Sequence, residues 1–315
     1  VTWLDYNWDE IHFASDYFNE LYTYAIELIK NNYAYVDSSS AEEIKKLRGT
    51  LTEPGKNSKD RNRTAKESLR IFEEMRNGNY KEGEYVLRLK IDMSSSNINM
   101  RDPVIYRIKK VRHHRTANDW PIYPLYDFTH CISDAQENIT HSLCTLEFED
   151  HRELYDWIID KIQHKNKPQQ IEFARLMIEN NVMSKRKLAE LVESKYVDGW
   201  DDPRMPTISG LRRRGFTPNS IKDFCRRIGV TKKNSFIEMG VLENTIREEL
   251  NLSAERVMGV LDPLKVTISN YPKDEEEVVK ATNNPNNKNS YRNINISREV
   301  YIDRSDFMEI PEKKY

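Results

Sequence analysis

Four stretches of sequence decide the fold, and the first is Ile122-Tyr-Pro-Leu-Tyr-Asp-Phe-Thr-His-Cys-Ile-Ser-Asp-Ala135. Thr140-His-Ser-Leu-Cys-Thr-Leu-Glu-Phe148 and Val182-Met-Ser-Lys-Arg-Lys-Leu188 follow it along the chain. The fourth is Gly199-Trp-Asp-Asp-Pro-Arg-Met-Pro-Thr-Ile-Ser-Gly-Leu-Arg-Arg-Arg-Gly215. In the third stretch a lysine lies beside a small hydroxyl, an arrangement that can place positive charge on a polyphosphate. By itself that short match is weak, because surface turns contain similar residues by chance.

The composition indicates a chain with a lean apolar core. Of its 315 residues 32% are charged and 38% are hydrophobic, and the net charge is -2. The length allows two or three domains, each with its own core. The sequence contains no run of eighteen apolar residues and no signal-peptide pattern, which argues against a membrane or secretory role. Its three scattered cysteines suit a reduced, cytoplasmic protein better than a disulfide framework.

Positive charge is concentrated between Leu211 and Lys233, where eight residues are basic and only Asp223 is acidic. This local excess of +7 could supply the phosphate contacts that RNA needs, although most charge runs are solvated faces. A protein-interaction face is the other interpretation of these basic helices.

Hydrophobic spacing predicts a helix over Asp16–Lys30 and strands over Tyr85–Ile91 and Val104–Ile108. In the first of these strands Arg88 and Lys90 alternate with leucine and isoleucine, which predicts one basic face. Strand-like segments return beyond residue 262, separated by an Asn-rich loop over residues 283–289.

Capping patterns predict where several helices begin. Asp150 is a candidate N-cap, and Thr217 followed by Pro218 predicts another helix start. The expected capping boxes are Ser40 with Glu43, Thr64 with Glu67, and Ser235 with Glu238.

A zinc site would need ligands from His130, Cys131, His141 and Cys144. Their spacing matches no common zinc finger, and two adjacent residues rarely bind the same ion. The chain, with ten glycines, also contains no Gly-rich phosphate loop and no dinucleotide fingerprint. We therefore expect no metal held by the protein itself.

The four stretches, in this order, resemble the second half of the catalytic region of glutaminyl-tRNA synthetases, which are class I aminoacyl-tRNA synthetases. Upstream, Arg48-Gly-Thr-Leu-Thr-Glu-Pro-Gly-Lys-Asn57 and Met100-Arg-Asp-Pro-Val-Ile-Tyr-Arg-Ile108 also fit the family. The resemblance covers nearly the whole chain. It implies an α/β fold, the second half of a class I synthetase Rossmann-type catalytic fold with an inserted α+β domain.

The resemblance also implies five domains or parts. They are residues 1–15, the end of the first half of the catalytic fold; 16–125, an inserted acceptor-stem-binding domain; 126–175, the second half of the nucleotide-binding fold; 176–255, a helical stem-contact subdomain with the KMSKS-type loop; and 256–315, the start of an anticodon-binding β-barrel.

The implied activity is ATP-dependent ligation of L-glutamine to its cognate tRNA, tRNA(Gln), through a glutaminyl-adenylate, with Mg²⁺ accompanying ATP. The family implies a cytoplasmic monomer without a membrane partner. Lys185 matches the lysine that stabilises the triphosphate and is the expected catalytic residue. The other residues expected to line ATP are Thr145, Arg175, Leu176, Met183 and Ser184.

Glutamine is expected to contact Tyr126, His130, Cys144 and Phe148. Related glutamyl enzymes commonly carry an arginine at the position of Cys144, which suits a carboxylate. A small thiol tolerates a carboxamide instead. Without the surrounding motifs, Tyr126 and Cys144 would be interpreted as ordinary packing residues.

For RNA, Leu51 matches a leucine that wedges into the end of the acceptor stem, and Asp150 matches a residue that reads a stem base pair from the minor groove. A segment that touches the inside of the tRNA corner contributes Thr231, Lys232, Lys233 and Glu238.

The sequence contains no His-x-Gly-His, the motif that class I synthetases carry in the first half of the fold. We therefore expect this polypeptide to be part of a longer enzyme and not to make the adenylate alone. The alternatives are a glutamyl or non-discriminating synthetase and a non-catalytic tRNA-binding module.

Overall fold

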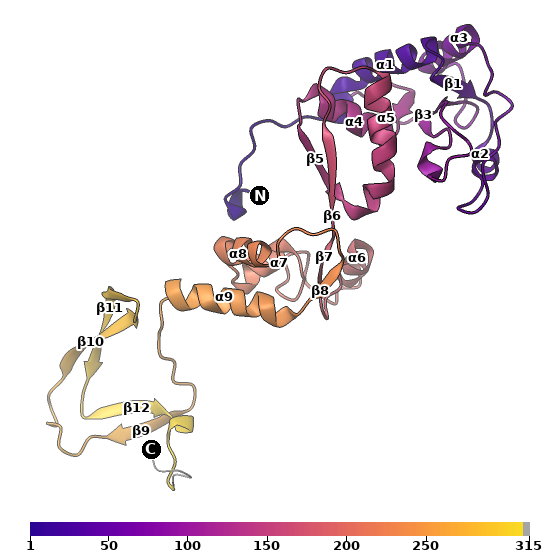
Figure 1. Ribbon diagram of the computed structural model, residues 1–315. Coiled ribbons are helices and arrows are strands. Elements are labelled where there is room, and N and C mark those ends of the chain that lie inside the picture. The colour runs from indigo at the N-terminus through magenta and orange to yellow at the C-terminus, as the bar shows by residue number, and fades with distance from the viewer. Residues whose placement is uncertain (311–315) are drawn as a thin grey trace. The chain divides into compact units, whose positions relative to one another are not determined.

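The structure is a computed structural model that describes residues 1–310, and the chain divides into two compact units (Figure 1). The N-terminal unit contains Asn7–Leu176 together with Val230–Ser235. The C-terminal unit contains Met177–Gly229 and the residues from Phe236 onwards, together with Val1–Tyr6.

An antiparallel four-stranded sheet in the order β1-β2-β3-β4 forms the first part of the N-terminal unit. Its strands are β1 (Ala34–Asp37), β2 (Val86–Leu89), β3 (Val104–Ile108) and β4 (Ile122–Pro124). The helices of this part are α1 (Phe18–Lys30), α2 (Ala41–Arg48) and α3 (Ala65–Arg76). Leu21, Ala25 and Leu28 recur on the face of α1 that is buried, so helical spacing explains why this face joins the core.

The second part of the N-terminal unit is a parallel pair of strands, β5 (His141–Thr145) and β6 (Gln169–Phe173), with helices α4 (Tyr126–Gln136) and α5 (Arg152–Lys161) (Figure 1). A 3-10 segment, Leu146–His151, connects β5 to α5. Phe72 of α3, Tyr106 of β3 and Phe128 of α4 stack edge to face, so one apolar core joins both parts.

The remaining elements of the described chain begin with β7. They are β7 (Leu176–Ile178), α6 (Lys185–Glu193), α7 (Ile208–Arg214), α8 (Pro218–Ile228), β8 (Ser235–Ile237), α9 (Met239–Ser253), β9 (Pro263–Thr267), β10 (Glu277–Asn284), β11 (Asn287–Ile296) and β12 (Glu299–Asp303). Strand β7 pairs with β8, β9 with β12, and β10 with β11. Within residues 1–310, the expected start of a β-barrel is therefore seen as open two-stranded sheets.

Several local predictions are confirmed. The side chains of Ser40 and Thr64 each accept the backbone N–H three residues on, and Glu43 and Glu67 return the bond, so both capping boxes are present. Thr217 caps α8, with Pro218 as its first residue. The predicted strand Val104–Ile108 is β3.

Other local predictions are wrong. The third capping box is absent, because Ser235 lies in β8 and Glu238 caps α9 without a side-chain hydrogen bond. Asp150 caps no helix, since α5 begins after His151. The Asn-rich loop is a tight hairpin in which Asn284 pairs with Asn287.

The basic face predicted for β2 is also wrong, because Arg88 is fully buried. Its Nη1 donates to Asp37 Oδ2 at 2.7 Å, and its Nε donates to the carbonyl oxygen of Asp102 at 2.7 Å. A guanidinium can lie in a core only when its charge and donors are satisfied in this way. The alternation in the sequence identified a strand but could not show that Asp37 lies on the neighbouring strand.

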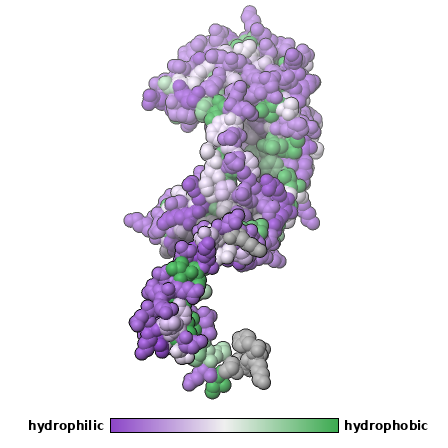
Figure 2. Space-filling model, turned by 90° about the vertical axis from the view of Figure 1, so that its left-hand side faces the viewer, coloured by the Kyte–Doolittle hydropathy of each residue, from purple (hydrophilic) through white to green (hydrophobic). Residues whose placement is uncertain are grey.

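Hydrophilic residues cover most of the face drawn in Figure 2, and apolar residues form small separate areas on it. None of the helices in residues 1–310 combines the length and the apolar composition needed to cross a membrane.

We predict that Asp37→Ala lowers the free energy of unfolding by about 3 kcal/mol, because it leaves the Arg88 guanidinium buried without a counter-charge. Asp16→Ala is the matched control, because Asp16 pairs with Arg115 at the surface, where solvent screens the pair, and its loss should cost much less. Denaturant unfolding followed by fluorescence measures both. Equal effects of the two substitutions would contradict the prediction.

Candidate functional site

Three of the four residues predicted to contact glutamine form a cluster of neighbouring rings in the N-terminal unit. Tyr126 is the first residue of α4, and its ring centroid lies 5.1 Å from that of His130 and 5.0 Å from that of Phe148. The Tyr126 ring is half-exposed, so a ligand can reach it. Burial, and then the proximity of Cys144, raise the pKa of Tyr126, so its phenol stays protonated and can donate a hydrogen bond.

The fourth residue, Cys144, lies on β5 and is buried. Its thiol faces a low-dielectric environment, and burial followed by the Glu172 carboxylate raises the pKa of Cys144. The thiol is therefore neutral near pH 7. The structure thus brings Cys144 close to the aromatic cluster as an uncharged group.

Behind the rings, Asp134 holds a hydrogen-bond network that the sequence did not reveal. Asp134 accepts the Ser142 hydroxyl and, at 2.9 Å, the Tyr155 hydroxyl, while His130 Nε2 lies 3.1 Å from its Oδ2. Burial opposes ionisation of Asp134, but the hydrogen bonds from His130, Ser142 and Tyr155 outweigh it and lower the pKa. Ser142 is buried and directs its proton to a carboxylate, so this cluster orients His130 and is no nucleophile triad.

Glu172 neutralises the positive charge near Cys144. In the parallel pair of strands Glu172 is the register partner of Cys144. Its carboxylate accepts two hydrogen bonds from Arg152, one from Gln170 Nε2 at 2.9 Å and one from Lys232 Nζ at 3.1 Å. Burial opposes ionisation, but these donors outweigh it and lower the pKa of Glu172 to about 2. Both cations are thus committed to a buried acid.

The residues predicted to bind ATP are distributed over both units. Thr145 ends β5, and Arg175 pairs with Glu147 at the surface of the N-terminal unit. Leu176 is the first residue of β7. Met183 and Ser184 belong to the C-terminal unit, where they precede α6.

Lys185 is the first residue of α6 rather than part of a loop. Ser184 is the N-cap residue, but its side chain makes no capping hydrogen bond, and the first turn contains no acid. The N-terminal N–H groups of α6 and the consecutive cations Lys185, Arg186 and Lys187 therefore combine their positive potential. Such a helix end suits a phosphate.

The structure places Leu51 and Asp150 in exposed positions of the N-terminal unit. Leu51 is 82% exposed on the loop after α2. Asp150 is exposed in the segment before α5, and its carbonyl oxygen accepts the side chains of Asn97 at 2.8 Å and Asn99 at 3.3 Å.

The third segment predicted to contact RNA begins at Thr231, where hydrogen bonds hold the backbone in place. Thr231 accepts the backbone N–H of Ala174 at 2.7 Å through its carbonyl oxygen and that of Lys233 at 3.1 Å through its hydroxyl. Lys232 lies against Glu172 and Glu149. Glu238, the last residue of this set, belongs to the C-terminal unit and precedes α9.

The +7 excess of Leu211–Lys233 overstates the free positive charge. Arg213, Arg214, Lys222, Arg227 and Lys232 each have an acidic partner, at distances from 2.7 to 3.6 Å. Three remain without one among residues 1–310, namely Arg212, Arg226 and Lys233. Most of these ion pairs are exposed and weak, so phosphates could replace the acids.

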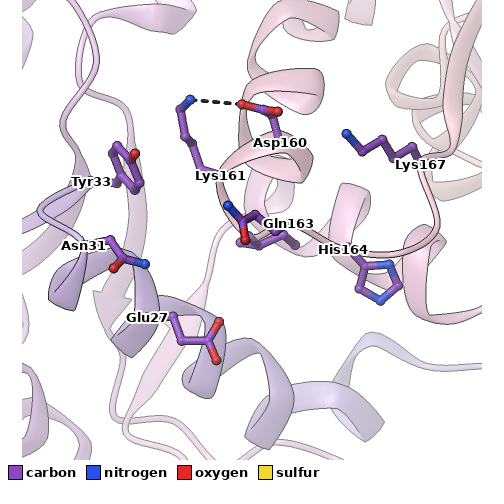
Figure 3. A pocket seen from close by; sticks show the side chains of 9 residues that line it. Glu27, Asn31, Tyr33, Asp160, Lys161, Gln163, His164 and Lys167 are labelled. Atoms are coloured by element: carbon purple, nitrogen blue, oxygen red, sulfur yellow. Dashed lines mark hydrogen bonds and ion pairs between the residues drawn. The ribbon is translucent and has the colours of Figure 1, made fainter.

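Two further features lie apart from the predicted residues. A cavity of about 690 Å³ is lined by Glu27, Asn31, Tyr33, Asp160, Lys161 and His164 among others (Figure 3). None of the residues predicted for ATP, glutamine or tRNA lines it. In the described part of the chain, no group of three or more His, Cys, Asp or Glu side chains could hold a metal ion.

Comparison with protein families gives two matches. Residues 1–252 match the catalytic domain of the class I tRNA synthetases for glutamate and glutamine (E and Q). Residues 254–315 match the anticodon-binding domain of the same class.

Curated relatives match over the whole chain. A glutamine–tRNA ligase from Clostridium kluyveri is 57% identical over 316 residues, and one from Proteus mirabilis is 58% identical over 317 residues. Each match covers 100% of this chain and 57% of the relative, so the chain spans a little over half the length of these relatives.

Among solved structures, a glutamate–tRNA ligase from Elizabethkingia meningosepticum aligns with a TM-score of 0.52 and 16% sequence identity. The alignment covers 80% of this chain and 58% of that one. At this identity the likeness concerns the fold alone, and it confirms the predicted mixed α/β fold of the class I synthetase type.

We predict that Glu172→Gln flattens the pH dependence of stability between about pH 5 and pH 2. The folded pKa of about 2 lies below the ordinary value of 4.5, so the carboxylate stabilises the fold fully above pH 4.5. That stabilisation, on the order of 3 kcal/mol, is lost as the pH falls through about 2.

Denaturant unfolding at a series of pH values measures this effect. The exposed Glu20 supplies a matched Glu→Gln control, which should leave the wild-type curve unchanged. Parallel curves for wild type and Glu172→Gln would show that the ionised Glu172 contributes nothing.

Proposed function

We propose that the protein ligates L-glutamine to tRNA(Gln) using ATP. The premise is that the chain belongs to the class I tRNA synthetases for glutamate and glutamine. The ligation would proceed through a glutaminyl-adenylate. The identity of 57–58% with glutamine–tRNA ligases along the whole chain supports this choice of amino acid.

The observation that carries the proposal is that both cations acting on Cys144 are paired with a buried acid, Glu172. A glutamate side chain needs a cation, whereas a glutamine carboxamide needs neutral donors and acceptors. Arg152 and Lys232, the cations that act on Cys144, are bound to Glu172. The Tyr126 phenol and the Cys144 thiol are both neutral. The surroundings of Cys144 and Tyr126 would therefore suit a carboxamide, and neither Arg152 nor Lys232 is free to pair with a carboxylate.

Lys185 would act on the triphosphate of ATP. When the carboxylate of the amino acid attacks the α-phosphorus, negative charge moves onto the departing pyrophosphate. The Lys185 ammonium and the free N–H groups of α6 would stabilise that charge as it develops. Thr145, Arg175, Leu176, Met183 and Ser184 would hold the nucleotide in position.

Mg²⁺ would reach the site on the triphosphate, because Mg²⁺ is commonly bound by substrate phosphates together with one or two carboxylates. The metal would neutralise phosphate charge while the protein positions the nucleotide.

Acceptor-stem recognition would use Leu51 as a wedge and Asp150 in the minor groove. Thr231, Lys232, Lys233 and Glu238 would contact the inside of the tRNA corner. Protein–RNA affinity depends mainly on phosphate contacts, and the basic residues Arg226 and Lys233 are exposed and available for them.

The proposed domain organisation follows the five ranges implied by the family, from the end of the first catalytic half in 1–15 to the anticodon-binding part in 256–315. We place the protein in the cytoplasm as a monomer, in keeping with its free cysteines Cys131, Cys144 and Cys225.

We predict that Lys185→Ala lowers the rate of ATP–pyrophosphate exchange about 100-fold, because one charge that stabilises the departing pyrophosphate is lost. Lys195→Ala is the matched control, since Lys195 is an exposed lysine beyond the end of α6. Exchange with labelled pyrophosphate at saturating glutamine measures both, in a longer enzyme that contains this chain together with the first half of the catalytic fold. A Lys185→Ala rate equal to that of the control would remove Lys185 from the chemistry.

We predict that Cys144→Arg shifts amino-acid preference from glutamine towards glutamate by at least about tenfold, or about 1.4 kcal/mol. The new guanidinium would supply a cation for the glutamate side chain, because Arg152 and Lys232 are bound to Glu172. Calorimetric titration with non-hydrolysable glutaminyl- and glutamyl-adenylate analogues measures the preference. Cys144→Ser is the uncharged control and should keep the wild-type preference; a Cys144→Arg protein that also keeps it would contradict the charge argument.

A further inference from the structure

Arg101 is a buried arginine that holds four backbone carbonyl groups. It is 3% exposed, and its Nε donates to the carbonyl oxygen of Ser95 at 2.7 Å. Its Nη1 donates to the carbonyl oxygens of Arg48, Thr50 and Glu53 at 2.8, 2.8 and 2.9 Å. Three of the four acceptors therefore belong to a single short loop, residues 48–53.

This loop is rigid for local reasons as well. Thr50 Oγ1 accepts the backbone N–H groups of Thr52 and Glu53, and the Thr50 N–H donates to the Glu53 carbonyl. Gly49 has a φ of 75°, and a Cβ built on it would lie 2.7 Å from the carbonyl oxygens of Glu53 and Pro54. Only glycine fits there without moving the backbone.

Leu51 lies at the tip of this loop with 82% of its surface exposed. An apolar side chain held in water by a rigid loop gains little for the folded protein, so its placement needs another explanation. A side chain that separates two stacked bases must keep its position when it contacts them. A loop that is already ordered also loses little conformational entropy on binding.

The same guanidinium ties the loop to the second RNA contact. Ser95, its fourth acceptor, opens a turn that continues through Asn97 and Asn99 to Arg101. The side chains of Asn97 and Asn99 donate to the carbonyl oxygen of Asp150. A continuous chain of hydrogen bonds therefore connects the Leu51 loop, through Arg101, with Asp150.

The turn itself is fixed by Asp102, which is 1% exposed and has a φ of 44°. Its carboxylate accepts Arg61 Nε at 2.6 Å, the Tyr35 hydroxyl at 3.2 Å and the Ile91 N–H at 2.8 Å. These bonds hold the strained backbone and set the direction in which Arg101 leaves the turn.

We propose that Arg101 is the positioning residue for acceptor-stem opening: it makes the Leu51 loop rigid and keeps it in register with Asp150. The inference rests on the proposed function, in which Leu51 separates the last base pair of the stem. Arg101 acts from beneath the loop and touches no RNA. Its loss should therefore matter only when there is a base pair to open.

The test compares two tRNA(Gln) transcripts, one with its first acceptor-stem pair intact and one with that pair mismatched. Binding to the purified chain is measured by fluorescence anisotropy at fixed salt. Arg101→Gln should bind the paired tRNA about tenfold more weakly than wild type and the mismatched tRNA within about twofold of it, as should Leu51→Ala. Arg70→Gln removes an exposed arginine on α3 and should change neither.

The outcomes separate this inference from the proposed function. If Leu51→Ala shows the selective loss and Arg101→Gln shows none, or loses both tRNAs equally, the positioning role is overturned and the wedge stands. If wild type binds neither tRNA, or Leu51→Ala binds the paired one normally, the proposed RNA role falls and this inference with it.

Circular dichroism establishes whether Arg101→Gln folds. If it does not, Arg101→Lys decides, because a lysine keeps the buried positive charge but its three donors cannot reproduce the guanidinium's bonds to all four carbonyl groups. Selective loss of the paired tRNA would then support the positioning role, and wild-type binding of both would overturn it.

Discussion

Two adjacent buried charges, Arg101 and Asp102, determine much of the geometry of the N-terminal unit. Neither can be left unsatisfied away from water, so the surrounding backbone supplies carbonyl groups to one and Arg61 and Tyr35 supply donors to the other. The result is that a loop carrying an exposed leucine, Leu51, becomes one of the more constrained parts of the surface. The contacts that satisfy these buried charges also support the loop that is proposed to contact RNA.

The surroundings of Cys144 also depend on a buried charge, which here is negative. Glu172 is a buried acid, and its ionisation is stabilised by Arg152, Lys232 and Gln170. Because these donors are bound to Glu172, neither Arg152 nor Lys232 is left as an unpaired cation beside Cys144. Lys232 also belongs to the segment that is proposed to contact tRNA. The same lysine would therefore pair with Glu172 and lie in the proposed RNA-binding segment. The proposed selectivity for an amide would thus depend on the supporting charges as much as on the contacting side chains.

Hydrogen bonds between residues close in the sequence could be predicted, whereas ion pairs and hydrogen bonds between distant residues could not. The capping box at Ser40 depends on residues three apart and was predicted correctly. Arg88 was expected outside, because alternation identifies a strand but not the buried partner Asp37 on the next one. Asp134 was missed since its donors come from two helices and a strand. The family motifs predicted Tyr126, His130 and Phe148 as one set, and their rings lie together.

The central claim is that the neutral groups Tyr126 and Cys144 favour glutamine over glutamate for transfer to tRNA. The most direct measurement is charging of purified tRNA by a longer enzyme that contains this chain, with ATP and, in parallel, labelled glutamine or labelled glutamate at equal concentration. We expect glutamine to be attached to tRNA(Gln) and glutamate to be attached at least about 100-fold more slowly, which corresponds to about 2.7 kcal/mol. Equal rates, or faster charging with glutamate, would contradict it.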